Sequence, residues 1–237
     1  MKKRMLLAAA ALVAMAALSG CMTVTVDGQP CRVTEERNAI VELKGEEGVN
    51  VQVEAGSLRV DGRPGAQEVR VTGTACAGSR ADLDRIQLTA ERSSDGWIRV
   101  QSQTPGGNAT LDLILEVPSD LKVMIRDESG SMLVRRLNRS LEIYDNSGDI
   151  EVYDVTGDVA IEDNSGTITV EKTGGNVEIR DDSGDIEVRT VSKNVTVRDS
   201  SGDIDVSDVG GNFTVASDGS GSVHHSSIRG TVSVPRK

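Results

Sequence analysis

Aromatic residues are scarce in this chain of 237 residues, which contains one tryptophan, two tyrosines and one phenylalanine. These four residues are Trp97, Tyr144, Tyr153 and Phe213. A sugar-processing cleft or a groove for single-stranded nucleic acid normally uses several aromatic platforms, so the composition disfavours both. Basic residues are also in deficit, since 26 Lys and Arg stand against 37 Asp and Glu. A nucleic-acid partner is therefore not expected, because binding to phosphates needs a basic face.

Glycine and the residues typical of strands and turns are abundant instead. The chain has 25 glycines and a formal net charge of −11. Val, Ile, Thr, Asp and Ser are frequent, and helical periodicity is absent. The exception is Ser79 to Leu88, where Ser79-Arg80-Ala81-Asp82 could cap a short helical turn. The composition predicts an acidic, β-rich and turn-rich protein, and it does not specify an activity.

One long apolar run occurs, and it is at the N-terminus. Met5 to Leu18 is apolar over 14 residues and follows Lys2, Lys3 and Arg4. A bilayer span takes about 20 residues, so this run fits the hydrophobic part of a secretory signal peptide. The run ends in Leu18-Ser19-Gly20-Cys21, which resembles the lipobox of bacterial lipoproteins. The alternative is an ordinary signal peptide that has a cysteine after its cleavage site.

The resemblance to bacterial lipoproteins implies cleavage of residues 1–20 and acylation of Cys21. Two or three acyl chains would anchor the protein stably, since each buried CH₂ contributes about 0.8 kcal/mol. The next residue is Met22. In the Gram-negative lipoproteins that this segment resembles, Asp at that position favours the inner membrane, so its absence implies the outer membrane. Residues 21–34 would form a lipidated tether, facing either the periplasm or the medium.

Two cysteines remain beyond the proposed anchor, Cys31 and Cys76. An exported protein enters an oxidising compartment, so these residues are candidates for a disulfide. Free or metal-binding thiols are the alternative. Neither cysteine lies in a CxxC motif or near a histidine, which favours the disulfide.

A repeat dominates the second half of the chain. An Asp-x-Ser-Gly motif recurs every 18 residues, beginning at Asp127, Asp145, Asp163, Asp181 and Asp199, and a late copy begins at Asp218. Each of the five regular copies also has two pairs of apolar residues with a spacing of two, such as Ile150/Val152 and Val159/Ile161. A spacing of two places both side chains of a pair on one face of a strand.

Two short strands per 18 residues predict a parallel β-solenoid with two main faces. The repeat is too short for a βαβ crossover, and stacked coils would align equivalent residues about 4.8 Å apart. An antiparallel meander is the competing arrangement, but the constant step favours the solenoid. Weaker alternation upstream extends the prediction to a single all-β domain over residues 35–234, with divergent coils over 35–108 and regular coils over 109–234.

The recurring Asp-x-Ser-Gly-Asp-Ile-x-Val and Gly-x-Val-x-Ile units resemble a bacterial envelope family that is labelled putative adhesin and has no established function. The resemblance extends over Val117 to Val234, and more loosely over the earlier half. It implies an exported or membrane-tethered β-solenoid. No catalytic or binding motif of that family maps onto individual residues here, so adhesion is a hypothesis.

The repeated aspartates are the strongest candidates for a site. Stacked coils would bring their carboxylates together, and clustered oxygens are ligands for Ca²⁺. The candidate ligands are Asp145, Asp163, Asp181 and Asp199. The competing interpretation, which the motif favours, is that each Asp accepts backbone N–H groups in an Asx-turn and that the glycine provides the left-handed backbone. No cofactor other than the covalent lipid is then expected.

No catalytic constellation is recognisable, because the sequence lacks a Gly-x-Ser-x-Gly elbow, a His-Glu-x-x-His motif and a P-loop. The sequence therefore predicts a non-enzymatic envelope lipoprotein that presents an acidic surface to an unidentified protein or glycan. The alternative is a carbohydrate-active or metal-dependent enzyme built on the solenoid. A cleft with converging carboxylates of perturbed pKa would favour the enzyme.

Overall fold

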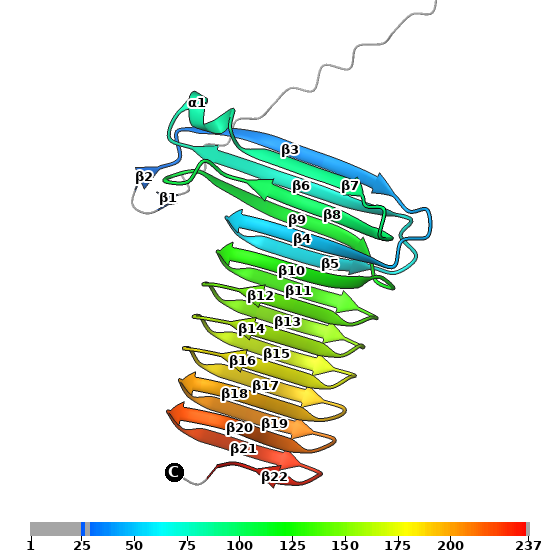
Figure 1. Ribbon diagram of the computed structural model, residues 1–237, viewed down its shortest axis with the longest axis vertical. Helices are drawn as coiled ribbons and strands as arrows, with labels where there is room; N and C mark the ends of the chain where they lie inside the picture. Colours follow the sequence, from blue (N-terminus) through cyan, green and yellow to red (C-terminus); the bar gives the residue numbers. More distant parts are fainter. Residues whose placement is uncertain (1–24, 27–28, 236–237) are drawn as a thin grey trace, which may run out of the picture.

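The computed structural model describes residues 25–26 and 29–235, and it is almost entirely β-structure. Within this described part, two ten-stranded sheets form the two faces of an elongated solenoid (Figure 1). Sheet I contains, in spatial order, β22 (Val232–Ser233), β20 (Phe213–Ser220), β18 (Val195–Ser201), β16 (Val177–Asp181), β14 (Val159–Asp163), β12 (Leu141–Asp145), β10 (Lys122–Ser129), β4 (Gly48–Ala55), β8 (Trp97–Gln103) and β7 (Gln87–Arg92). Sheet II contains β21 (Val223–Ile228), β19 (Ile204–Val209), β17 (Ile186–Val191), β15 (Ile168–Thr173), β13 (Ile150–Val155), β11 (Met132–Leu137), β5 (Leu58–Arg63), β9 (Thr110–Pro118), β6 (Glu68–Ala77) and β3 (Val33–Glu42).

The regular coils confirm the predicted parallel solenoid. From β10 to β21 each coil contributes one strand to each sheet, and the strands of successive coils pair in parallel. Ile150 pairs with Ile168, Ile168 with Ile186 and Ile186 with Ile204, so the register equals the 18-residue step. The antiparallel meander is thereby excluded for this region.

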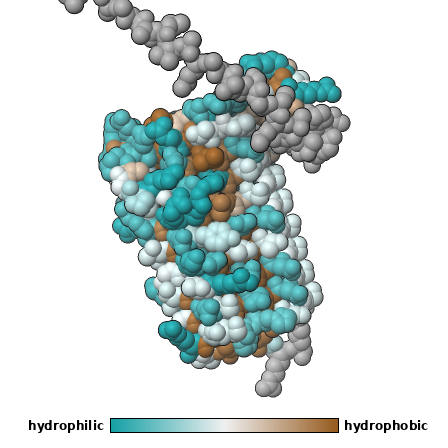
Figure 2. All heavy atoms as spheres, turned by 180° about the vertical axis from the view of Figure 1, so that it is seen from behind, coloured by the Kyte–Doolittle hydropathy of each residue, from teal (hydrophilic) through white to brown (hydrophobic). Residues whose placement is uncertain are grey.

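The interior is a stack of aliphatic side chains that follows directly from the alternation in sequence. In the β17–β18 coil, Ile186, Val188, Val191, Val195 and Val197 are all at most 2% exposed. Most of the polar and charged residues between them face outward, as expected when successive residues of a strand point to opposite faces. Figure 2 accordingly shows a largely hydrophilic surface, with hydrophobic side chains gathered in its upper half.

A left-handed residue in each coil explains why Val188 and Val191, three positions apart, both point inward. Thr190 lies between them with φ of 57°. This conformation bends the strand and returns the next side chain to the interior. The equivalent residues with positive φ are Arg136, Asp154, Lys172, Asp208 and Ser227. Sequence reasoning missed this bend because glycine does not mark it.

Replacing Thr190 with glycine is expected to stabilise the protein by about 1 kcal/mol. A β-branched residue is strained at positive φ, and glycine relieves that strain. Thermal unfolding of Thr190→Gly provides the measurement. Thr196→Gly, in an extended part of β18, is the matched control and should lose stability, since glycine weakens an ordinary strand position. Equal destabilisation of both variants would contradict the expectation.

The N-terminal part differs from a plain succession of divergent coils over residues 35–108. The β4–β5 coil lies between the β8–β9 coil and the β10–β11 coil, so the spatial order of the coils departs from chain order. Moreover, three pairs of strands here are antiparallel: β3 pairs with β6, β6 pairs with β9, and β7 pairs with β8. These strands cover one end of the solenoid, because the segment after β5 reverses direction before β8 and β9 resume the coil path.

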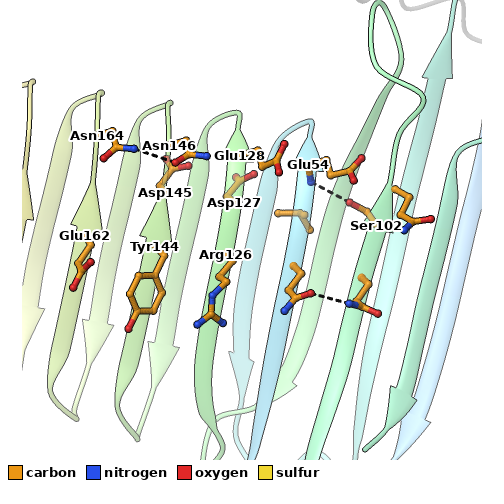
Figure 3. Close-up of a pocket in the computed structure, with 14 residues that line it drawn as sticks. Glu54, Ser102, Arg126, Asp127, Glu128, Tyr144, Asp145, Asn146, Glu162 and Asn164 are labelled. Carbon is orange, nitrogen blue, oxygen red and sulfur yellow. Dashed lines mark hydrogen bonds between the residues drawn. The ribbon is translucent and has the colours of Figure 1, made fainter.

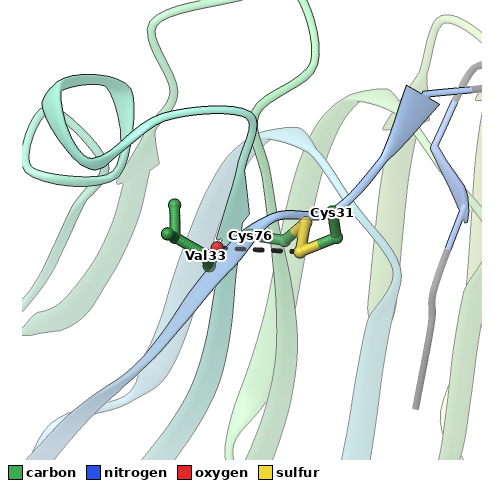
Figure 4. The surroundings of a disulfide bond; sticks show 3 residues. All are labelled: Cys31, Val33 and Cys76. Atoms are coloured by element: carbon green, nitrogen blue, oxygen red, sulfur yellow. Dashed lines mark hydrogen bonds between the residues drawn. A yellow bond between two sulfur atoms is a disulfide. The ribbon is translucent and has the colours of Figure 1, made fainter. Parts of the chain in front are cut away.

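A short helix and a disulfide lie at this covered end. Helix α1 (Arg80–Leu83) begins after Ser79, whose Oγ accepts a hydrogen bond from the backbone N–H of Asp82 at 3.2 Å, as predicted for a cap. Cys31 and Cys76 are joined in a disulfide with their Cα atoms 5.8 Å apart (Figure 4). The bond attaches the segment before β3 to the end of β6. A short antiparallel pair, β1 (Thr25–Val26) and β2 (Gln29–Pro30), precedes it.

The double variant Cys31→Ser/Cys76→Ser is expected to be less stable by about 2–4 kcal/mol. The bond closes a loop between residues 45 positions apart, and its removal restores conformational freedom to the unfolded chain. The melting temperature with and without reductant measures the effect. Reductant should lower the melting temperature of the parent protein and leave that of the double variant unchanged, whereas an unchanged parent would contradict the expectation.

The membrane anchor predicted from the sequence is not part of the described structure. Residues 1–20 and Cys21 lie outside the described residues, and Arg236 and Lys237 do as well. Within the part of the chain that is described, no helix has the length and hydrophobicity required to cross a bilayer.

Candidate functional site

The repeated aspartates form a ladder along one corner of the solenoid. Asp127 pairs in register with Asp145, and the alignment continues through Asp163, Asp181 and Asp199. Asp127, Asp163, Asp181 and Asp199 each accept a hydrogen bond at Oδ1 from the backbone N–H two residues later, at 3.0–3.2 Å. This is the Asx-turn that the motif predicts.

The ladder faces the interior, whereas a calcium site requires carboxylates that a cation can reach. The five side chains are 1–5% exposed. Each aspartate follows an inward residue by two positions, as Asp145 follows Ile143, and so shares the buried face of its strand. Within the described residues, no group of three or more His, Cys, Asp or Glu side chains is placed to hold a metal ion. Asp145, Asp163, Asp181 and Asp199 are thus stacked one per coil.

Burial and mutual repulsion make ionisation of the ladder unfavourable. Burial, with the neighbouring Asp145, raises the pKa of Asp127 to about 7. Burial, with Asp163 next to each, raises the pKa of Asp145 to about 6 and that of Asp181 to about 7. The Oδ2 atoms of Asp127, Asp163, Asp181 and Asp199 have no hydrogen-bond partner. The ladder is therefore an interior array of carboxyl groups that ionise with difficulty.

A groove of about 540 Å³ crosses the outer face of sheet I next to the ladder (Figure 3). It lies over β8, β4, β10, β12 and β14. One row of side chains runs across it in register, namely Gln101, Gln52, Arg126, Tyr144 and Glu162. Since all five occupy equivalent outward positions, their spacing is that of neighbouring strands, about 4.8 Å.

The contacts within the row hold its side chains in defined positions. The Arg126 guanidinium lies over the Tyr144 ring, 4.9 Å from its centroid. Nε2 of Gln101 donates a hydrogen bond to Oε1 of Gln52 at 2.7 Å. These groups give the groove one aromatic surface, hydrogen-bond donors and acceptors, and a guanidinium, with Glu54 and Glu128 along its side.

Two ladder aspartates, Asp127 and Asp145, also border the groove, but their carboxyl groups are turned toward the interior (Figure 3). The groove thus presents polar and aromatic binding groups, and the carboxyls of raised pKa are buried beneath it. Sequence reasoning did not find this groove. Tyr144 and Glu162 could have been aligned from the repeat, but Gln52 and Gln101 belong to coils outside the regular repeat.

Solved structures of low sequence identity match most of this chain. A putative adhesin from Bacteroides fragilis is 13% identical, with 84% of this chain and 96% of that chain covered and a TM-score of 0.48. A putative lipid binding protein from Parabacteroides distasonis is 13% identical, with coverage of 84% and 97% and a TM-score of 0.44. A putative cell adhesion protein from Clostridium sporogenes is 11% identical, with coverage of 86% and 100% and a TM-score of 0.41. No curated protein matches the chain.

A family model provides a more direct assignment. The Toastrack DUF4097 model matches residues 48–228. These limits coincide with the first residue of β4 and the last residue of β21. The match therefore spans the coils and also the segment from β6 to β7, which includes α1. The predicted resemblance to a family of β-solenoid proteins without an established function is thereby confirmed at the level of family and fold, and this chain belongs to the Toastrack DUF4097 family.

Proposed function

We propose that this chain is a non-enzymatic lipoprotein of the bacterial envelope, anchored in the outer membrane through lipid on Cys21, and that its solenoid binds a protein or glycan partner. The lipobox-like sequence before Cys21 supports the anchor. In this arrangement the lipid tethers the covered end of the solenoid, near β3 and α1, and the C-terminal coil lies at the other end (Figure 1).

The observation that carries the proposed binding function is the row from Gln101 to Glu162 on sheet I. Tyr and Arg, like Trp, are enriched at the energetic centres of interfaces, and here Arg126 and Tyr144 are adjacent in an open groove. The neighbouring amides and carboxylates can hydrogen-bond the hydroxyl groups of a glycan or the backbone of an extended peptide. An extended ligand that crosses the strands would meet one such group at each strand.

The enzyme alternative requires an acid or base that reaches the substrate. In the groove, the carboxyls with raised pKa belong to Asp127 and Asp145, which are 4% and 5% exposed. Asp127 is also engaged at Oδ1 by the backbone N–H of Ser129. Burial and this hydrogen bond favour a structural role over proton transfer to a bound substrate.

Crosslinking of the lipidated protein in intact envelopes, followed by recovery of its partners, tests this proposal. The parent protein should recover a defined protein or glycan, and Arg126→Ala/Tyr144→Ala should reduce recovery by about tenfold or more, the effect of losing a hot-spot contact. Tyr153→Ala is the matched control, because this tyrosine lies on sheet II. Equal recovery by all three proteins, or no reproducible partner, would refute binding by this groove.

A further inference from the structure

A cluster of guanidinium groups on sheet II reverses the charge of this acidic protein locally. Asp61 on β5 is 3% exposed. Its carboxylate accepts a hydrogen bond from Nε of Arg59 at 3.1 Å and another from Nε of Arg135, and Nη2 of Arg136 lies 3.1 Å from Oδ1. Three cations therefore surround one anion, in a chain whose formal net charge is −11.

The guanidinium groups retain donors for a further anion. Each guanidinium has five N–H donors, and Asp61 has only two oxygens. The side chains of Arg59, Arg135 and Arg136 are 41%, 30% and 37% exposed, so their remaining donors are accessible. The nearby Arg63 is paired with Glu116. The excess positive charge is therefore confined to the three arginines around Asp61, and guanidinium forks match phosphate well.

A mostly apolar groove of about 340 Å³ adjoins the arginine cluster. Ile114, Leu133 and Met132 contribute to its lining, and Arg59 belongs to both the groove and the cluster. Ile114 is 47% exposed, and among the residues whose exposure is described only Ile40 and Val232 are other large hydrophobics so exposed. An exposed apolar residue beside a cationic cluster is a combination that the packing of the solenoid does not require.

The acids near this groove already have hydrogen-bond partners. Oδ1 of Asp112 accepts hydrogen bonds from the backbone N–H and the hydroxyl of Ser57, at 2.8 and 2.9 Å. Oε2 of Glu151 accepts from the Tyr153 hydroxyl at 3.1 Å. Neither acid takes part in the arginine cluster, where three guanidinium groups face the single carboxylate of Asp61 and leave a local excess of positive charge at the Arg59 end of the groove.

We propose that the groove and the arginine cluster together bind a lipid with a phosphate head group. The acyl chain lies along Ile114 and Leu133, and the phosphate receives hydrogen bonds from Arg59, Arg135 and Arg136. Charge complementarity selects an anion, and the apolar wall selects one that carries a hydrocarbon chain. This site is separate from the groove on sheet I, and it does not depend on the function proposed for that groove.

Photolabelling tests the proposal with the full lipidated protein in phosphatidylcholine nanodiscs. The probe is a short-chain photoactivatable phosphatidic acid, and adducts are mapped by mass spectrometry. We expect adducts in β9 and β11 and a loss of labelling of about tenfold or more in Arg59→Gln/Arg135→Gln, as for a hot spot. Arg99→Gln/Arg189→Gln removes equal charge elsewhere and should label like the parent protein.

Further experiments distinguish recognition of the lipid head group from recognition of its acyl chain. Ile114→Ser leaves Asp61 fully paired and alters only an exposed side chain, so reduced labelling of this variant remains a test if the arginine variant does not fold. Equal labelling of the parent and Ile114→Ser, equal labelling by a phosphatidylcholine probe, or complete competition by inorganic phosphate at the probe's concentration would each overturn the proposal. The last outcome would indicate a site for free phosphate.

Discussion

Replacing Gly184 with alanine is expected to destabilise the solenoid by about 3 kcal/mol or more, the cost of a severe steric and backbone conflict. Gly184 has φ of 146°, and a Cβ atom added to it would lie 1.8 Å from the carbonyl oxygen of Gly166 in the preceding coil. The colliding atom belongs to the backbone, so no side-chain rotation can relieve the clash. Relief would require separation of two coils that are held by strand pairing.

The same constraint applies to each copy of the motif. Gly148, Gly166, Gly202 and Gly221 also have positive φ, and an added Cβ would lie 1.8–1.9 Å from the carbonyl oxygen of the glycine one coil earlier. The glycines of the Asp-x-Ser-Gly motif thus form a ladder in which the absence of a side chain permits close stacking. Conformational freedom alone does not explain the motif, since the contact between coils is an independent requirement.

Gly106→Ala separates these two requirements. Gly106 has φ of 76°, but an added Cβ would meet nothing within 4 Å, so alanine there is expected to cost about 1 kcal/mol of backbone strain. For a domain of this size, each 1 kcal/mol shifts the melting temperature by about 2–4 °C. A loss for Gly184→Ala no larger than that for Gly106→Ala would contradict the stacking argument.

Asp181→Asn is expected to stabilise the protein at pH 8 by about 1–3 kcal/mol and to have little effect at pH 4, from the scale of 1.36 kcal/mol per pKa unit. Burial and the adjacent Asp163 raise the pKa of Asp181 from 3.8 to about 7. Below the ordinary pKa the carboxyl is protonated in both folded and unfolded protein, so it carries no penalty. As the pH rises from about 4 to about 7, the unfolded chain ionises more readily, and stability is lost.

The physical cause is the position of Asp181 within the ladder. The side chain is 1% exposed, Oδ2 has no hydrogen-bond partner, and Asp163 and Asp199 occupy the adjacent coils. An asparagine can retain the contact of Oδ1 with the backbone N–H of Ser183 while it removes the charge. The carboxyls titrate as a coupled set, so one substitution also lowers the repulsion felt by its neighbours.

Asp182→Asn is the matched control because it changes the net charge equally at an exposed neighbouring position. Its stability should follow the parent protein across the pH range. Thermal unfolding of the three proteins between pH 4 and pH 8 provides the measurement. A gain that is independent of pH, or one that Asp182→Asn shares, would contradict a role for the buried ladder.

The inward orientation of the ladder aspartates shows how much of the structure the repeat could predict. The 18-residue step and the paired apolar residues predicted a parallel solenoid because equal spacing brings equivalent residues into register. The sequence also contained a signal for the buried aspartates, since Asp145 follows Ile143 by two positions and Asp163 follows Ile161 by two. Charged side chains usually lie on the surface, but the parity of the strand placed these carboxyls inside, where the Asx-turn and partial protonation accommodate them.

The two candidate binding surfaces could not be predicted, because each joins strands that are distant in sequence. Gln101 and Gln52 reach the row of Arg126 and Tyr144 only because β8 and β4 stack on β10. Likewise, Asp61 contacts Arg135 because β5 pairs with β11, although the strands from β6 to β10 separate them in the sequence. Their positions result from long-range strand pairing, for which no local spacing provides a signal.

Thr190 and the few aromatic residues show which features the repeat determines and which depend on contacts between coils. The repeat by itself determined the coil, its parallel direction, the glycine positions and the aliphatic interior, since these depend on periodicity along one chain. Tertiary structure alone decided the left-handed bend at Thr190, the interleaved order of the first coils and the stacking of Gln52 and Gln101 beside Arg126. The physical reason is that these features arise from packing between coils, where backbone contacts and burial outweigh the local preference of each residue.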